Sequence, residues 1–267
     1  MDRPAPNPIL RVGILTAGLT EPYAPYTTAL GIAFRADLPL PPHPVDAGLA
    51  PFFQFFQRIL RPTGSRAEFY LLGNIHEPEF PAAVDQMAGF AVDMILWWTL
   101  SLPPARNSTL PDPALDAAVL RAASSGVTVV YPCFSGPDVD SPQMFRVGGL
   151  AIDNRHLALC PAPSLAALLP PKLVSWGDWE TCKKTWIFAG FNDGLPDASP
   201  NMNEHSLATW TVASYLATIR SRSPRETAAA NLARAWPALC IPIETGPPGA
   251  SSPALYFDPR HVQQYGK

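Results

Sequence analysis

The stretch that decides the fold runs Asn203-Glu204-His205-Ser206-Leu207-Ala208-Thr209-Trp210-Thr211-Val212-Ala213-Ser214-Tyr215-Leu216-Ala217. Its small and apolar residues predict a long buried helix over Ser206–Arg220, which begins at Ser206. A serine there lies beside backbone N–H groups that lack helical partners, at the positive end of the helix dipole. An ordinary N-cap serine occupies the same place, so the rest of the chain has to decide whether Ser206 is a nucleophile or a cap.

Outward from this helix, short apolar β-rich runs alternate with helical patterns along the chain. The expected strands are Ile9–Leu15, Glu68–Leu72, Val92–Trp98, Val127–Tyr131, Val147–Ile152 and Leu173–Trp176. The other expected helices are Pro51–Leu60, Pro81–Ala91, Ala114–Ser125, which Gly126 ends, and Arg225–Trp236. This alternation predicts a three-layer α/β/α fold with a mostly parallel central sheet. In such folds the site lies beyond the carboxyl ends of the strands.

The length of 267 residues suits a single domain over 1–267. We expect its core over about residues 9–221, followed by a C-terminal helix and a Pro/Gly-rich tail over residues 222–267 that wraps the surface. The formal net charge of −3 gives no reason to expect a nucleic acid partner. No apolar run approaches the roughly 18 residues of a membrane span, and the start lacks the pattern of a secretory signal. These features predict a cytoplasmic protein, and its four cysteines, without a Cys-x-x-Cys pair, predict reduced thiols without a metal site or cofactor.

Four segments follow one another in an order that is typical of a known family. They are Val12-Gly13-Ile14-Leu15-Thr16-Ala17-Gly18, Ala67–Trp98, Ala114–Gly136 and His205-Ser206-Leu207-Ala208-Thr209. Taken together, they resemble the subtilisin-like serine peptidases, in particular the intracellular fungal domains of that family. The last segment is similar to the family's nucleophile motif Gly-Thr-Ser-x-Ala-Thr-Pro and keeps its Ser, Ala and Thr. The resemblance implies a subtilisin-like fold and places Ser206 at the nucleophile position.

The resemblance also implies that the rest of the catalytic machinery is replaced. Thr16 stands where the family has its aspartate, and Gln54 stands where it has the histidine. Ser135 takes the place of the oxyanion asparagine, to within about one residue. Glutamine cannot accept a proton near neutral pH, and loss of the base and its orienter costs about 10³–10⁶ in rate. The sequence therefore predicts a protein that is not a functional serine peptidase.

Aromatic residues dominate the segments that would surround the former cleft. Of the four phenylalanines at positions 52, 53, 55 and 56, we expect Phe55 and Phe56 to be ordinary core packing. If Phe53 and Trp98 project into the cleft, they form an apolar pocket with a few polar groups, an arrangement that suits small molecules. The predicted catalytic residues are Ser206 and Gln54, and the predicted ligand-binding residues are Thr16, Phe53, Trp98, Thr99, Ser135 and His205.

Three functions remain open on the sequence. The first is an enzyme, related to secondary metabolism, that binds a small hydrophobic substrate and guides a cyclisation or isomerisation by restraint and hydrogen bonding. The second is a pseudoprotease module that binds a peptide or protein without turnover, with free strand edges for β-augmentation. The third is a rewired serine hydrolase that uses Ser206 with a different base. The sequence leaves the oligomeric state open.

Overall fold

The computed structural model describes residues 9–15, 32–33, 49–72, 79–97, 113–132, 141–152, 157–159, 187–189, 204–222, 230–231, 240–245 and 252–257. Its helices are α2 (Leu49–Leu60), α3 (Phe80–Gly89), α4 (Pro113–Ser124) and α7 (Glu204–Arg220), and a short 3-10 turn, η1 (Arg61–Thr63), follows α2. Its strands are β1 (Ile9–Leu15), β2 (Ile32–Ala33), β3 (Arg66–Leu72), β4 (Met94–Trp97), β5 (Thr128–Pro132), β6 (Met144–Ile152), β7 (Leu157–Leu159), β8 (Ile187–Ala189), β9 (Cys240–Thr245) and β10 (Ser252–Phe257).

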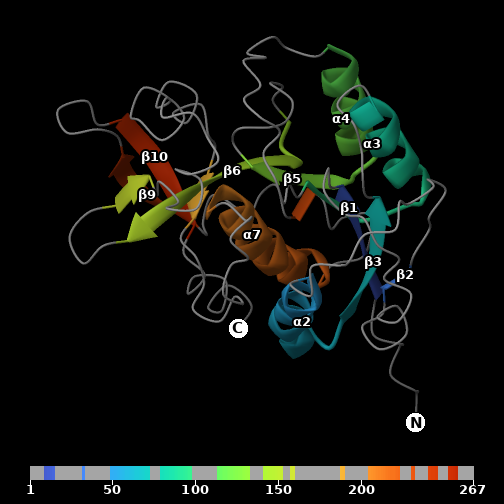
Figure 1. Cartoon of the computed structure of the whole chain (residues 1–267), viewed down its shortest axis with the longest axis horizontal. Coiled ribbons are helices and arrows are strands. Elements are labelled where there is room, and N and C mark those ends of the chain that lie inside the picture. The colour runs from blue at the N-terminus through green and yellow to red at the C-terminus, as the bar shows by residue number, and fades with distance from the viewer. Residues whose placement is uncertain are drawn as a thin grey trace.

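The strands form one sheet in the order β2-β3-β1-β4-β5-β6-β8-β10-β9, with β7 beside β6 (Figure 1). Neighbours along this order are parallel except for β10 and β9, which are antiparallel. The central strand β1 places Leu15 opposite Leu72 of β3 and Trp97 of β4. Because these strands are parallel, their carboxyl ends meet at one edge of the sheet. The mostly parallel sheet predicted from the alternating pattern is confirmed.

Two apolar clusters fill the space on either side of the sheet. Helices α2 and α7 pack on one face, where the rings of Phe53 and Phe56 each contact both Phe69 and Trp210. Helices α3 and α4 pack on the other face, around Met87 and the other apolar residues of that cluster. The sheet therefore lies between two helical layers, and the predicted three-layer α/β/α architecture is confirmed.

Gly13 lets α3 pack closely against the centre of the sheet. A Cβ atom at this position would lie 2.7 Å from Sδ of Met87, which is closer than real Cβ contacts allow. Any larger residue in β1 at this position would require the side chain of Met87 to shift, and glycine avoids this.

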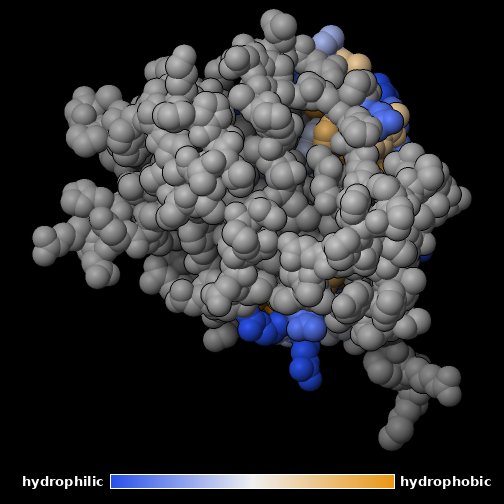
Figure 2. All heavy atoms as spheres, in the orientation of Figure 1, coloured by the Kyte–Doolittle hydropathy of each residue, from blue (hydrophilic) through white to orange (hydrophobic). Residues whose placement is uncertain are grey.

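The outer surface of α3 and α4 carries both hydrophilic and hydrophobic residues where the structure describes it (Figure 2). There Arg121 of α4 donates hydrogen bonds to both carboxylate oxygens of Asp85 of α3, at 3.2 Å and 2.7 Å. This hydrogen bond raises the pKa of Arg121. Both side chains are about half exposed, so solvent screens the pair and its contribution to stability is small.

The predicted strands and helices that fall within the described residues are recovered with shifts of at most three residues at their ends. The tail that was expected to wrap the surface instead contributes β9 and β10, an antiparallel pair that extends the sheet through β8. The Gly/Pro-rich residues 246–251 separate two apolar runs, which is a hairpin signal, so the prediction for this segment is wrong. The predicted strand Leu173–Trp176 and most of the helix Arg225–Trp236 lie outside the described residues.

Candidate functional site

The direction of α7 determines where Ser206 lies. Arg220, in the last turn of α7, donates hydrogen bonds to the carbonyl oxygen of Gly126 at 2.7 Å and to Oγ1 of Thr128 at 2.8 Å. Both partners lie at the amino-terminal end of β5. Helix α7 therefore runs antiparallel to the strands that it covers, and its first turn, with Ser206, points toward their carboxyl ends.

The lengths of the elements support the same placement. At about 1.5 Å per residue, Ser206 lies about 21 Å along the helix axis from Arg220. At about 3.3 Å per residue, the five residues of β5 span about 17 Å or less. The first turn of α7 therefore reaches the carboxyl edge of the sheet or passes it. Unpaired N–H groups and the positive end of the dipole of α7 lie at this edge.

The strands that precede the other predicted positions end at the same edge. Strand β1 ends at Leu15, one residue before Thr16, and β4 ends at Trp97, directly before Trp98 and Thr99. Strand β5 ends at Pro132, three residues before Ser135. Residues 16, 98, 99 and 135 themselves lie outside the described residues, and the side chains of His205 and Ser206 are not described either. The topology places the described ends of β1, β4 and β5 at one edge.

Phe53 is not a pocket residue in this structure. Its side chain is 0% exposed, and its ring centroid lies 4.7 Å from that of Phe69 and 5.9 Å from that of Trp210. A side chain without exposed surface cannot line a ligand site, so the ligand-binding interpretation of Phe53 is corrected to a core role. Phe55 and Phe56, expected to be core packing, are buried as predicted.

Gln54 lies on the solvent side of α2. It is exposed, one residue from the fully buried Phe53, because successive residues point about 100° apart around a helix. The side chain that connects α2 to the sheet is instead that of Gln57, three residues further along the helix. The Gln57 amide donates to the carbonyl oxygen of Ala67 at 2.7 Å and accepts from its N–H at 3.1 Å, which fixes α2 to β3.

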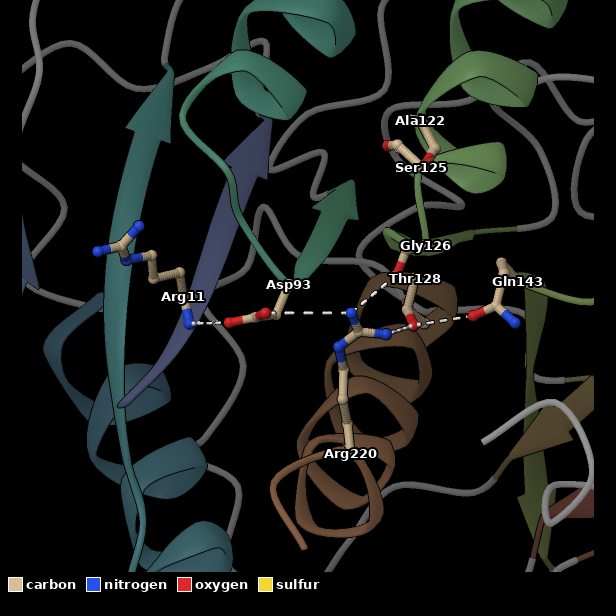
Figure 3. A network of polar contacts seen from close by, with 8 residues as sticks. All are labelled: Arg11, Asp93, Ala122, Ser125, Gly126, Thr128, Gln143 and Arg220. Atoms are coloured by element: carbon tan, nitrogen blue, oxygen red, sulfur yellow. Dashed lines mark hydrogen bonds and ion pairs between the residues drawn. The ribbon is translucent and has the colours of Figure 1, made fainter. Parts of the chain in front are cut away.

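Sequence patterns did not reveal a buried polar network at the opposite, amino-terminal edge of the sheet (Figure 3). Arg220 and Asp93 are 4% and 6% exposed, and Nη2 of Arg220 lies 4.0 Å from Oδ1 of Asp93. The other carboxylate oxygen of Asp93 accepts a hydrogen bond from the N–H of Arg11 at 2.8 Å. The available signal was an arginine at the end of an otherwise apolar helix, since a buried cation requires partners.

Other features of the described residues add no further chemistry. Among them, no group of three or more His, Cys, Asp or Glu side chains could hold a metal ion. No helix within the described ranges is long and apolar enough to cross a membrane.

Comparisons with known proteins find the fold without a family assignment. No protein-family model and no curated protein match the chain. A solved structure, "PatG macrocyclase in complex with peptide", is similar with a TM-score of 0.51 and 14% sequence identity over 88% of this chain and 83% of that chain. The "PatG macrocyclase domain" is similar with a TM-score of 0.47 and 12% identity over the same shares. At 14% identity, the similarity to the first of these structures establishes the fold alone. This chain has a subtilisin-like α/β fold.

Proposed function

We propose that this chain is a subtilisin-fold protein that binds a small hydrophobic substrate at the carboxyl edge of its sheet without hydrolysing peptide bonds. It guides a cyclisation or isomerisation in which the substrate keeps all its atoms. The direction of α7 is the observation that carries this proposal, because it brings Ser206 to the edge where β1, β4 and β5 end. Thr16 and Gln54, at the positions that the resemblance assigns to the aspartate and the histidine, supply no base for that serine.

The proposed chemistry uses hydrogen-bond donors and restraint. The first-turn N–H groups of α7, the Ser206 hydroxyl and the Gln54 amide donate to a carbonyl oxygen as negative charge develops on it. Gln54 is exposed, so its amide is available to a substrate that lies against α2. Holding a flexible apolar substrate in a reactive conformation lowers the entropic part of the barrier. In this proposal the walls of the site are the segments after the strands, with Thr16, Trp98, Thr99, Ser135 and His205, whereas Phe53 stays in the core.

A second function is favoured by one observation: the similar PatG macrocyclase structure was solved in complex with a peptide. In that case the same edge binds a peptide or protein segment, as a pseudoprotease module without turnover. The third possibility, a hydrolase that uses Ser206, requires a base from elsewhere in the chain.

One mass measurement separates the three functions. The purified protein is incubated with two panels, linear hydrophobic peptides and linear apolar polyene esters, and the products are analysed by chromatography and mass spectrometry. An isomerase or atom-conserving cyclase produces a new peak of unchanged mass, a hydrolase produces products that together contain one added water, and a binding module changes nothing. A new peak of unchanged mass is the result that we expect, from at least one apolar substrate.

Variants assign any such activity to the site. Ser206→Ala and Gln54→Ala are expected to abolish the new peak while the proteins stay folded, because the first removes a single oxygen atom and the second shortens an exposed side chain. Arg121→Ala, on the exposed surface of α4, is the matched control and is expected to keep full activity. Full turnover in both site variants would remove the donor assignment, and hydrolysed products would overturn the proposed function.

A further inference from the structure

We propose that Arg220 is a positioning residue for Ser206. By binding the amino-terminal ends of the strands, it sets how far α7 extends toward their carboxyl ends, and so where its first turn lies. The chemical meaning of this role rests on the proposed function, but the geometry that supports it does not.

The guanidinium of Arg220 binds two strands at once (Figure 3). It donates to Oγ1 of Thr128 and to the carbonyl oxygen of Gly126, which belong to β5 and the turn before it. It also faces the carboxylate of Asp93, directly before β4. These are the strands whose other ends lead to Trp98 and Ser135, so α7 is fixed against the same elements that carry the predicted site.

The partners of Arg220 are themselves held in place. Asp93 accepts the N–H of Arg11, and the N–H of Asp93 donates to the carbonyl oxygen of Arg11 at 2.8 Å, which links the carboxylate to β1. Gly126 has a φ of 83°, a conformation that favours glycine, and the turn it forms directs its carbonyl oxygen at Arg220. The N–H of Thr128 donates to the carbonyl oxygen of Asp93 at 3.1 Å. The arginine therefore binds a rigid frame formed by three strands.

Most of the buried side chains along the rest of α7 are apolar, with Thr209, Thr211 and Ser214 buried among them. The hydroxyl of Ser214 donates within the helix, to the carbonyl oxygen of Trp210 at 2.8 Å. Apolar contacts favour burial but fix position less sharply than hydrogen bonds, whose strength falls steeply with geometry. Because a helix is stiff along its axis, a displacement at Arg220 is transmitted to Ser206. A misplacement of about 1 Å at a reacting group can cost about 100-fold in rate.

A second contact holds the end of α7 against the helix that carries Gln54. The hydroxyl of Ser221 lies 3.2 Å from that of Thr63 in η1, directly after α2. The carboxyl-terminal ends of both helices on this face are thus fixed at the amino-terminal edge of the sheet. Their first turns point toward the carboxyl edge, where we propose that the substrate binds.

The test places a titrating probe at the first turn of α7. In Ser206→Cys, the pKa of the introduced thiol is read from the pH dependence of its alkylation by iodoacetamide. Mass spectrometry of the peptide that contains position 206 resolves this thiol from the four native cysteines. A helix N-terminus lowers a thiol pKa below its usual value of about 8.5. Adding Arg220→Met is expected to shift this pKa by about half a pH unit, because the first turn of α7 carries the thiol to a new place relative to the groups outside the helix.

Matched variants separate positioning from stability. Val84→Ala destabilises the opposite core, around α3, without touching α7, and is expected to leave the pKa of the introduced thiol unchanged. Thr128→Val removes one partner of Arg220 while keeping the volume, and it provides a second test that does not depend on the folding of Arg220→Met. It is expected to shift the pKa by a smaller amount.

The outcomes for the two proposals are distinct. The pKa of the introduced thiol is compared between Ser206→Cys alone and Ser206→Cys combined with Arg220→Met or with Thr128→Val. Identical values would overturn the positioning role. An equal shift with Val84→Ala would also overturn it, because the effect would then follow from destabilisation alone. The proposed function fails by a different result, the absence of a new peak of unchanged mass from both substrate panels, whatever the pKa of the introduced thiol.

Discussion

Phe53 and Gln54 are adjacent in α2. We expect truncation of Phe53 to alanine to lower the stability of the fold strongly, and truncation of Gln54 to leave it almost unchanged. Phe53→Ala removes a fully buried ring from between Phe69 and Trp210. Gln54→Ala shortens an exposed side chain. The pair therefore tests the core role of Phe53 with its own sequence neighbour as the control.

The magnitude follows from the burial of the ring. A buried phenylalanine removes about 150–200 Å² from water, worth about 4–5 kcal/mol at about 25 cal/mol per Å². Core Phe→Ala substitutions cost about 3–5 kcal/mol. We therefore expect Phe53→Ala to lower the free energy of unfolding by about 4 kcal/mol, a large part of the roughly 5–15 kcal/mol of a typical domain. Phe53→Leu keeps most of the volume and should cost less than about 1.5 kcal/mol.

The assay is equilibrium unfolding in urea, followed by intrinsic tryptophan fluorescence. Trp210 lies against the ring of Phe53, so its emission reports the same part of the core. Gln54→Ala is expected to change the free energy by less than about 0.5 kcal/mol. A cost below about 1 kcal/mol for Phe53→Ala would refute the core assignment and return this residue to the candidate ligand site.

Three further predictions concern the frame that supports the site. Arg220→Met should lower the free energy of unfolding in urea by about 3–5 kcal/mol, because it leaves Asp93 buried without its cation. The double variant Arg220→Met/Asp93→Leu should recover part of that loss. Fully additive losses in the double variant would contradict the pairing. Gly13→Ala should cost about 1–3 kcal/mol through the close approach of Met87, and less in a Met87→Ala background. An equal cost in both backgrounds would contradict this clash. Arg121→Ala should leave the urea midpoint unchanged, because its ion pair with Asp85 is exposed to solvent. A clear loss of stability would show that solvent screens this ion pair less than we infer.

Local patterns were sufficient to predict most of the central fold. Strand β1 was predicted with its observed bounds because its apolar run is short, continuous and typical of a buried parallel strand. Gly126 was predicted to end α4, and its φ of 83° agrees with that role. Helical periodicity identified α7 as buried, although the observed helix begins two residues before Ser206.

Contacts between distant residues were beyond the reach of these patterns. Periodicity shows that α2 has an apolar face, but it did not establish that Phe53 points to the core and Gln54 to solvent. The partners Arg220 and Thr128 are 92 residues apart, so nothing local in the sequence joins them. The pairing of β9 with β10 did have a local signal, the two apolar runs on either side of residues 246–251. The high proline content of this part of the chain obscured that signal.

The central claim is that the fold keeps a serine at the start of α7 without the base that activates it. Its most direct test is labelling of the purified protein with a fluorophosphonate, read by intact mass, with Ser206→Ala as the control. We expect no labelling beyond that of the control, because an unactivated hydroxyl is a poor nucleophile. Rapid labelling by one adduct that disappears in Ser206→Ala would contradict it, because Ser206 would then have a base and the protein would be a hydrolase.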